Sequence, residues 1–586
     1  VIIPNFAEWR IANLAISDRV VAVGDLAGGA TAVTVSNDLT IANGGLCVGG
    51  IAVARGMADS IAGPASNPAV TVGGDILLSG GGALTLGVSG QGSPLALTAG
   101  ANVVVEGSNS ALVVGGTEQV ATGVVYFGSA LTLTNGGTFK VHGAATNSTT
   151  MNYGTVVTVT DLINVGPASW IYPYAQRTNG GTVMFRAGSL AIATNGGINA
   201  DEKGFSSGYG PGKAASYSGA GYGGKGGHGG QGGAGGGATY GSTNAPFDPG
   251  SGGSSGAGGG SVRIYAAGDV TIDGIISANG QSASGAGSGG AISIACDGVF
   301  SGGIAGQLLA LGGNGSIYGA GGGGRIAVAC PNMDSGAIQC RFSTAAGTTG
   351  YVPAGMGTVC LPNANLVSDT LHRFDGVRLV IPDFTTWDTA SLTISNRVVG
   401  LEPLGGCLAS LKITNDLIIA NGGLGVGGVP IARGVSDSIA GQVSNPVMTV
   451  GGNLLLRNGG ALALGISGQG SPLTLAVGTN VVIDGSNSAL VVGGADQMAT
   501  SVVTIGDAMI LTNGGSLSVY AAATNNATTN YGAVVAIHGA VTVGSSSWIY
   551  PYSQRTNGGS VQFQVGSLAI ATNGGINADG RGYTAS

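Results

Sequence analysis

The chain repeats its own sequence at a fixed offset. The segment around Trp170 recurs around Trp548, and the difference, 548 − 170, is 378 residues. Residues 1–208 and 379–586 are therefore two copies of one module, and residues 209–378 form a glycine-rich segment between them. A long, gapless period is typical of tandem arrays. It limits the fold to architectures that can be extended one unit at a time.

These three regions are the domain organisation that we expect, with the second copy as a truncated second 378-residue unit. The chain begins on a strand-like Val-Ile-Ile, and its last residues stop at a point where the first copy runs on. We therefore expect each terminus to continue into more of the same repeat, either along one polypeptide or by contact with an identical subunit.

The composition excludes several classes of protein. Charged residues make up 8% of the chain, where a globular domain has roughly 25%. The hydrophobic share is 43% and the mean hydropathy is +0.37, so we expect a folded chain rather than disorder. The net charge is −7 and Lys and Arg are not clustered, which argues against nucleic acid as a partner. Every apolar run is interrupted well before the roughly 20 residues of a membrane-spanning helix.

Short strand-like phrases, each followed by a glycine corner, recur through both copies. Residues 130–137 read Ala-Leu-Thr-Leu-Thr-Asn-Gly-Gly, and residues 189–197 end in the same Thr-Asn-Gly-Gly. Alternation with a period of two indicates strands with one buried face, and no segment keeps a period of 3.6. We predict an all-β fold, a right-handed parallel β-helix with coils of roughly 25 to 35 residues. A β-sandwich or β-barrel is the alternative.

The corners suit asparagine because its backbone tolerates a positive φ. If successive corners are stacked, their amides could form a hydrogen-bonded ladder; alternatively, each Asn serves only its own turn. The corner residues are Asn43, Asn135, Asn179, Asn195, Asn421, Asn458, Asn513, Asn557 and Asn573.

Residues 222–236 have a different pattern, in which a side chain follows every two glycines. Three residues per turn is the geometry of polyproline II, and two glycines per turn let neighbouring backbones approach closely. We therefore predict an ordered bundle of polyglycine-II type, with partners among the glycine-dense segments 250–260, 285–290 and 319–324. The alternative is a flexible linker.

Four segments of the central region carry a resemblance to a known group of proteins. They are residues 256–264 (Gly-Ala-Gly-Gly-Gly-Ser-Val-Arg-Ile), 270–280, 289–294 and 321–328 (Gly-Gly-Gly-Gly-Arg-Ile-Ala-Val). Together they resemble the glycine-rich parallel β-helix repeats of very large bacterial surface and secreted proteins. That resemblance implies extracellular display and a filament or adhesin-like role, and it brings no catalytic residues.

The cysteines suggest structural roles. No Cys-x-x-Cys or Cys/His spacing indicates zinc, iron–sulfur or haem, so we predict no metal and no cofactor. Cys296 and Cys330 end matching strands and are expected on adjacent coils. Disulfides among Cys296, Cys330, Cys340 and Cys360 fit an oxidising compartment, and buried thiols are the other interpretation.

Aromatic residues gather in one six-residue phrase that occurs once in each copy. On an extended strand, aromatics at positions i, i+2 and i+4 share a face, which could stack on sugar rings or on another fibre. The other interpretation is a buried rung that fills a wide part of the coil. The candidate binding residues are Trp170, Tyr172, Tyr174, Trp548, Tyr550 and Tyr552.

No catalytic constellation stands out. Asp269, Asp273 and Asp297 are weak candidates for paired carboxylates, since Asp-Gly is more often a turn. We predict a non-enzymatic structural segment of a long extracellular fibre, surface stalk or sheath. Its expected partners are further copies of itself, and glycans are a second partner class. An adhesin or glycan-binding stalk is the alternative, and a β-helical polysaccharide-degrading enzyme is a remote one.

Overall fold

The computed structural model is an all-β parallel solenoid of about 17 turns. It describes residues 8–23, 30–49, 66–87, 92, 94–145, 154–229, 235–348, 353–382, 384–403, 410–426, 446–465, 472–523 and 532–583. Within these ranges no residue is helical. The chain divides into two compact units, Val1–Thr358 and Val359–Ser586. The predicted parallel β-helix is thus confirmed, and the sandwich and barrel are excluded.

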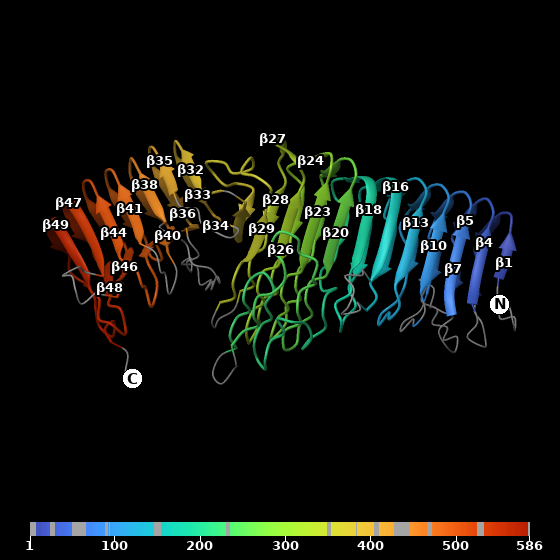
Figure 1. Cartoon of the computed structure of the whole chain (residues 1–586), viewed down its shortest axis with the longest axis horizontal. Coiled ribbons are helices and arrows are strands. Elements are labelled where there is room, and N and C mark those ends of the chain that lie inside the picture. Colours follow the sequence, from blue (N-terminus) through green and yellow to red (C-terminus); the bar gives the residue numbers. More distant parts are fainter. Residues whose placement is uncertain are drawn as a thin grey trace. The chain divides into compact units, whose positions relative to one another are not determined.

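Each coil of unit 1 contributes one short strand to each of three rows, and the strands of a row pair in parallel with those of the next coil (Figure 1). The first row contains β1 (Glu8–Ile11), β4 (Ala30–Val35), β7 (Ser66–Val72), β10 (Leu95–Ala99), β13 (Gly123–Phe127), β16 (Thr155–Val165), β18 (Val183–Ile192), β20 (Ser261–Ala266), β23 (Ala291–Cys296) and β26 (Arg325–Ala329). The second row contains β2 (Leu14–Ser17), β5 (Leu39–Ala42), β8 (Ile76–Ser79), β11 (Val103–Glu106), β14 (Leu131–Thr134), the second halves of β16 and β18, β21 (Val270–Ile272), β24 (Val299–Gly302) and β27 (Asn332–Ile338). The third row contains β3 (Val20–Val23), β6 (Gly45–Val48), β9 (Ala83–Leu86), β12 (Ala111–Val114), β15 (Thr138–His142), β17 (Trp170–Tyr174), β19 (Gly197–Asn199), β22 (Ile275–Ser277), β25 (Gln307–Leu309) and β28 (Arg341–Ser343).

Unit 2 has the same three rows. The first contains β32 (Thr386–Thr389), β35 (Ser410–Ile413), β38 (Val447–Val450), β41 (Leu473–Val477), β44 (Ser501–Ile505), β47 (Ala533–Val543) and β49 (Val561–Ile570). The second contains β33 (Leu392–Ser395), β36 (Leu417–Ala420), β39 (Leu454–Arg457), β42 (Val481–Asp484), β45 (Met509–Thr512) and the second halves of β47 and β49. The third contains β31 (Val377–Ile381), β34 (Val398–Pro403), β37 (Gly423–Val426), β40 (Ala461–Leu464), β43 (Ala489–Val492), β46 (Ser516–Tyr520), β48 (Trp548–Tyr552) and β50 (Gly575–Ile576). Two short strands, β29 (Gly357–Cys360) and β30 (Phe374–Asp375), precede these rows.

Inward side chains of successive coils stand on one another in unbroken apolar columns. In the first row of unit 1, Val70 pairs with Leu97, Leu97 with Val125, and Val125 with Val157. All four are fully buried. Each such side chain contributes roughly 1.5–3 kcal/mol by leaving water. The columns explain why the strands alternate with a period of two.

The two copies fold alike in detail. β16 and β47 are the same length, and each contains an irregularity in register toward the next strand. That irregularity lies between Val159 and Leu162 in unit 1 and between Ile537 and Ala540 in unit 2, which is the same place after the offset of 378 (537 − 159). The gapless sequence repeat is therefore also a repeat of strand pairing.

Most corner asparagines adopt the expected left-handed backbone, with φ of 49° at Asn43, 54° at Asn135 and 63° at Asn195. At Asn179 and Asn557 the following glycine has the positive φ instead, 79° at Gly180 and 76° at Gly558. The left-handed region is tolerated by Asn and Gly, which explains why these residues recur at the corners.

A side-chain ladder forms, but in a different column from the one we expected. The amide of Asn135 donates to Glu106 of the preceding coil at 3.2 Å rather than to another corner asparagine. The continuous ladder lies before the second-row strands, where Asp38 accepts from the backbone N–H of Asp75 at 2.9 Å, and Asp75 accepts from that of Asn102 at 2.8 Å. Side-chain oxygens there satisfy backbone donors one coil further on.

The glycine-rich sequence occupies one corner of the solenoid. It lies between a third-row strand and the next first-row strand, in residues 200–260, 278–290, 310–324 and 344–356, which we call the glycine bundle. Figure 1 shows these segments leaving the sheets without strands, mostly in green.

Backbone groups of the bundle bond to one another directly. Gly224 N–H donates to Gly323 O at 2.8 Å, Gly323 N–H to Gly355 O at 2.9 Å, and Gly289 N–H to Gly322 O at 2.9 Å. Within the predicted period-three run, residues 222–229 and 235–236 have neither helix nor strand, and the remaining five residues lie outside the described ranges. The polyglycine-II geometry itself stays a prediction.

The bundle excludes side chains at many of its glycines. A Cβ atom on Gly322 would lie 2.1 Å from Gly224 O, and one on Gly323 would lie 1.8 Å from Thr344 O. Backbone atoms cannot rotate away as a flexible side chain can, so these glycines are required by close approach.

We predict that Gly322→Ala lowers the free energy of unfolding by about 1–3 kcal/mol, because the new methyl group overlaps the backbone of a neighbouring segment. The matched control is Gly235→Ala, where a Cβ would meet no atom within 4 Å. Urea denaturation of the full chain measures both variants. Equal stability of Gly322→Ala and the wild type would show that the bundle is loosely packed.

Candidate functional site: an outward aromatic rung

The aromatic residues of β17 lie on the outer face of the coil. Trp170, Tyr172 and Tyr174 are half-buried, while Ile171 and Pro173 between them are buried. Because side chains of a strand alternate between its two faces, the three rings share the outer face. We call these three residues of β17, and their equivalents in β48, the aromatic rung. The rings therefore do not fill the interior of the coil.

The tryptophan of each rung covers a glycine of the next coil. Trp170 pairs with Gly197, whose Cβ would lie 2.6 Å from the indole ring. In unit 2, Trp548 pairs with Gly575, where the same distance is 2.8 Å. The two tryptophans thus occupy equivalent environments, and in both copies glycine makes room for the ring.

The tyrosines of the unit 1 rung are held between neighbouring coils. His142 of the preceding coil stacks on Tyr174, with ring centroids 4.4 Å apart and planes inclined by 8°. From the following coil, the ammonium group of Lys203 lies 5.3 Å from the ring centroids of both Tyr172 and Tyr174. A cation at this distance from an aromatic face is attracted to it.

Unit 2 repeats this arrangement with two exchanged residues. Tyr520 takes the place of the histidine and stacks on Tyr552 at 4.2 Å and 11°. Arg581 takes the place of the lysine, and its guanidinium carbon lies 4.5 Å from the centroid of Tyr550 and 4.9 Å from that of Tyr552. The stack and the cation are thus kept although the residue types differ.

The cation of each copy is anchored in the same way. Lys203 donates to Asn199 Oδ1 at 3.0 Å, and Arg581 donates to Asn577 Oδ1 at 2.7 Å. Each also donates to a backbone carbonyl two residues before it in the sequence. Our sequence analysis missed this cation, although its signal was present as a Lys-to-Arg exchange at the 378-residue offset.

A small cavity of about 30 Å³ lies beside the unit 1 rung. Gln176 shapes its edge, because its Oε1 accepts from the backbone N–H groups of Thr178 and Asn179 at 2.8 and 2.6 Å, and its Nε2 donates to Glu118 at 3.4 Å. The lining residues are Gly116, Thr117, Glu118, His142, Gly143, Tyr174, Ala175, Gln176, Arg177, Glu202 and Lys203.

Burial controls the protonation of this site. Desolvation, with smaller contributions from the positive charges of Arg177 and Lys140, lowers the pKa of His142 to about 4. Desolvation also lowers the pKa of Lys203 and raises that of Tyr174. At neutral pH the stack therefore consists of a neutral imidazole on a neutral phenol, with the positive charge supplied from outside it.

We predict that acidification destabilises the wild-type protein more than His142→Tyr. Unfolded histidine titrates near 6.5 and His142 in the folded state near 4, so the unfolded chain takes up a proton first. The stability contributed by the neutral imidazole is complete above pH 6.5 and falls as the pH drops from 6.5 to 4. Urea denaturation across this range measures the difference.

His142→Tyr is a matched variant because tyrosine is the natural residue at this position of unit 2. The reciprocal change, Tyr520→His, should add acid sensitivity, since Arg555 and Arg581 act on that position. Parallel pH profiles of the wild type and both variants would contradict the assigned protonation.

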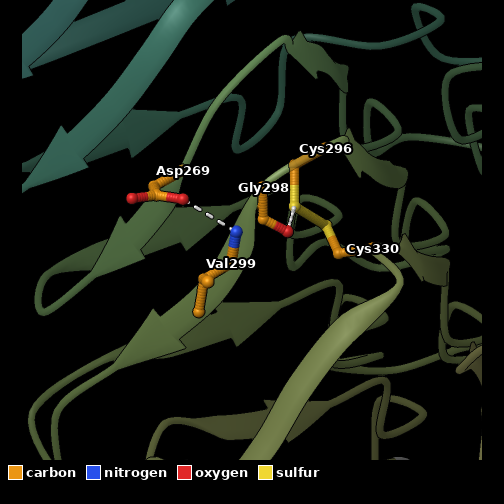
Figure 2. Close-up of a disulfide and its surroundings, with 5 residues drawn as sticks. All are labelled: Asp269, Cys296, Gly298, Val299 and Cys330. Atoms are coloured by element: carbon orange, nitrogen blue, oxygen red, sulfur yellow. Dashed lines mark hydrogen bonds between the residues drawn. A yellow bond between two sulfur atoms is a disulfide. The ribbon is translucent and has the colours of Figure 1, made fainter.

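The structure joins two of the four cysteine candidates. Cys296 ends β23 and Cys330 follows β26, and the two form a disulfide with a Cα–Cα distance of 4.8 Å (Figure 2). The bond links adjacent coils in register. Cys340 and Cys360 are buried thiols, and desolvation raises the pKa of Cys360 to about 11.

The three weak carboxylate candidates are engaged in structural hydrogen bonds. Asp269 accepts from the backbone N–H of Val299 at 2.8 Å, as Figure 2 shows, and Asp273 accepts from that of Gly303 at 2.7 Å. Asp297 accepts from the hydroxyl of Tyr265 at 2.5 Å. Each bond joins one coil to the next, as in the ladder at Asp38.

Within the described ranges, no three His, Cys, Asp or Glu side chains come together in an arrangement that could hold a metal ion. The same residues include no helix long and apolar enough to cross a membrane. Comparison of the sequence with models of known protein families and with curated proteins found no match.

Proposed function

We propose that this chain is a structural repeat segment of a long extracellular fibre, surface stalk or sheath. The observation that carries the proposal is the recurrence of strand bounds, register irregularity and aromatic rung at one offset of 378 residues. A repeat that keeps its pairing geometry adds material along one axis, as solenoid proteins do.

Mechanical service is consistent with how the coils are joined. Ten coils of unit 1 are described, and at about 4.8 Å per coil they extend roughly 48 Å. Backbone hydrogen bonds, apolar columns and side-chain ladders all connect one coil to the next. A load along the solenoid axis is therefore shared by many parallel contacts.

The remaining parts of the proposal follow from chemistry. The disulfide between Cys296 and Cys330 favours an oxidising, extracellular location, because reducing compartments keep thiols reduced. A non-enzymatic role is supported by Asp269, Asp273 and Asp297, whose carboxylates serve hydrogen bonds between coils. We propose further copies of the same repeat as the main partner.

We predict that chains built from one, two and three consecutive 378-residue units form particles whose length increases by a constant step of roughly 50 Å per unit. Electron microscopy of negatively stained particles measures the step. The matched control is one unit joined to residues 209–378 alone, which should add less length than a whole unit. Particles that grow in width at constant length would contradict the proposal.

A glycan-binding stalk is the second candidate function, and one observation favours it. The rung tyrosines are half-buried on the outer face, beside an anchored cation and a small cavity, in both copies for the rings and the cation. Aromatic faces that stay open to solvent can stack on the apolar faces of sugar rings. The anchored lysine or arginine would favour sugars that carry carboxylate or sulfate groups.

We predict that Tyr172→Ala combined with Tyr550→Ala weakens binding to an acidic polysaccharide, with alginate and heparin as probes, by about tenfold or more. Tyr126→Ala is the matched control, because Tyr126 is 42% exposed and lies on β13, outside the rung. Affinity electrophoresis in polysaccharide-containing gels measures retardation. Equal mobility of the wild type with and without both polysaccharides would exclude this second candidate.

A further inference from the structure

Two tyrosine rings touch on the exposed side of the glycine bundle. Tyr217 is 49% exposed, and its ring centroid lies 4.5 Å from that of the half-buried Tyr318, with the ring planes inclined by 57°. The two residues come from different bundle segments and are 101 residues apart in the sequence (318 − 217). We propose that this pair is an oxidative modification site at which the two phenols join as a dityrosine cross-link.

The backbone holds the pair in place. Tyr217 has a φ of 65°, a conformation that residues other than glycine seldom adopt. Its carbonyl accepts from the N–H of Gly319 at 3.2 Å. Two residues further on, a Cβ on Gly219 would lie 1.8 Å from the carbonyl oxygen of Ala320. The two segments are therefore in direct backbone contact beside the rings. Unusual backbone conformations persist where the surroundings enforce them.

Two further tyrosine pairs show why this one is suited to coupling. Tyr222 and Tyr240 lie 4.7 Å apart, but Tyr222 is fully buried and out of reach of an external oxidant. Tyr520 and Tyr552 are stacked nearly parallel, at 11°. Coupling joins ring edges, so a parallel stack must first slide and turn. The inclined Tyr217–Tyr318 pair combines solvent access with an edge directed toward its neighbour.

The reaction needs an external one-electron oxidant, for which we name a haem peroxidase with hydrogen peroxide. Each phenol loses one electron and its hydroxyl proton, which gives two phenoxyl radicals. The two electrons and two protons reduce one hydrogen peroxide to two water molecules. A carbon–carbon bond then forms between the carbons ortho to the two oxygens, and the hydrogen on each of these carbons moves to the oxygen as the rings regain aromaticity. The product has two hydrogen atoms fewer than the two tyrosines.

Proximity should make this product dominant. The two rings are held together by the fold, and reactions between groups held in this way are favoured by orders of magnitude over those between molecules. Tyr209 supplies a matched comparison, since it is 48% exposed and no ring contact is recorded for it. Exposure alone would make Tyr209 and Tyr217 equally reactive toward coupling, whereas the proposal singles out Tyr217.

The test treats the full chain with horseradish peroxidase and hydrogen peroxide, followed by proteolysis and mass spectrometry. We expect a peptide that joins Tyr217 to Tyr318, lighter by two hydrogen atoms than the sum of its parts, at a yield about tenfold above any cross-linked peptide of Tyr209. The link should be absent in Tyr217→Phe and in Tyr318→Phe, which keep a ring but lack the phenol. It should persist in Tyr209→Phe.

A mixture of isotope-labelled and unlabelled chains separates links within a chain from links between chains. Products without mixed labels support the proposal. A Tyr217–Tyr318 product of mixed label, cross-links formed equally by Tyr209, or a complete absence of the joined peptide while other tyrosines couple would each overturn it. Circular dichroism of the two Phe variants checks folding, and the wild-type comparison with Tyr209 decides the question even if one variant fails to fold.

Discussion

In-register parallel pairing between coils is the constraint on which the rest of this structure depends. Because Val70, Leu97 and Val125 pair directly, each inward position meets the same kind of residue above and below it. A shift by one residue would turn every apolar column toward water. The same register aligns Cys296 with Cys330 and places His142 on Tyr174. Packing, covalent linkage and the aromatic rung are thus consequences of one pairing pattern.

The sequence was sufficient for features that repeat within a coil. Period-two alternation predicted the parallel solenoid, and Asn-Gly-Gly predicted corners with positive φ. Contacts between coils were harder, because loops of unequal length separate equivalent positions. Asp75 meets Asn102 at 27 residues, while Asp201 meets Asn279 at 78. The Asp38 ladder and the Lys203 cation were therefore missed, since no fixed spacing in the sequence links them to their partners.

Comparison of the two copies separates what the fold requires from what it allows. Lys203 and Arg581 differ in shape, yet each donates to an asparagine and lies over two tyrosines. His142 and Tyr520 differ in titration but not in stacking. The requirement is a positive charge beside a planar stack, and several side chains meet it. Glycines opposite the tryptophans, by contrast, are the same in both copies because the indole leaves no room.

The glycine bundle has a consequence for survival outside the cell. Strandless segments are normally where proteases cut, since an extended chain fits their active sites and its side chains enter their specificity pockets. Here the strandless segments consist largely of residues with no side chain to offer, and their N–H and C=O groups already bond to neighbouring glycine segments. An enzyme that approaches this region finds neither a side chain to grip nor a free backbone edge. The composition that makes the bundle intolerant of substitution thereby also makes it a poor proteolytic substrate.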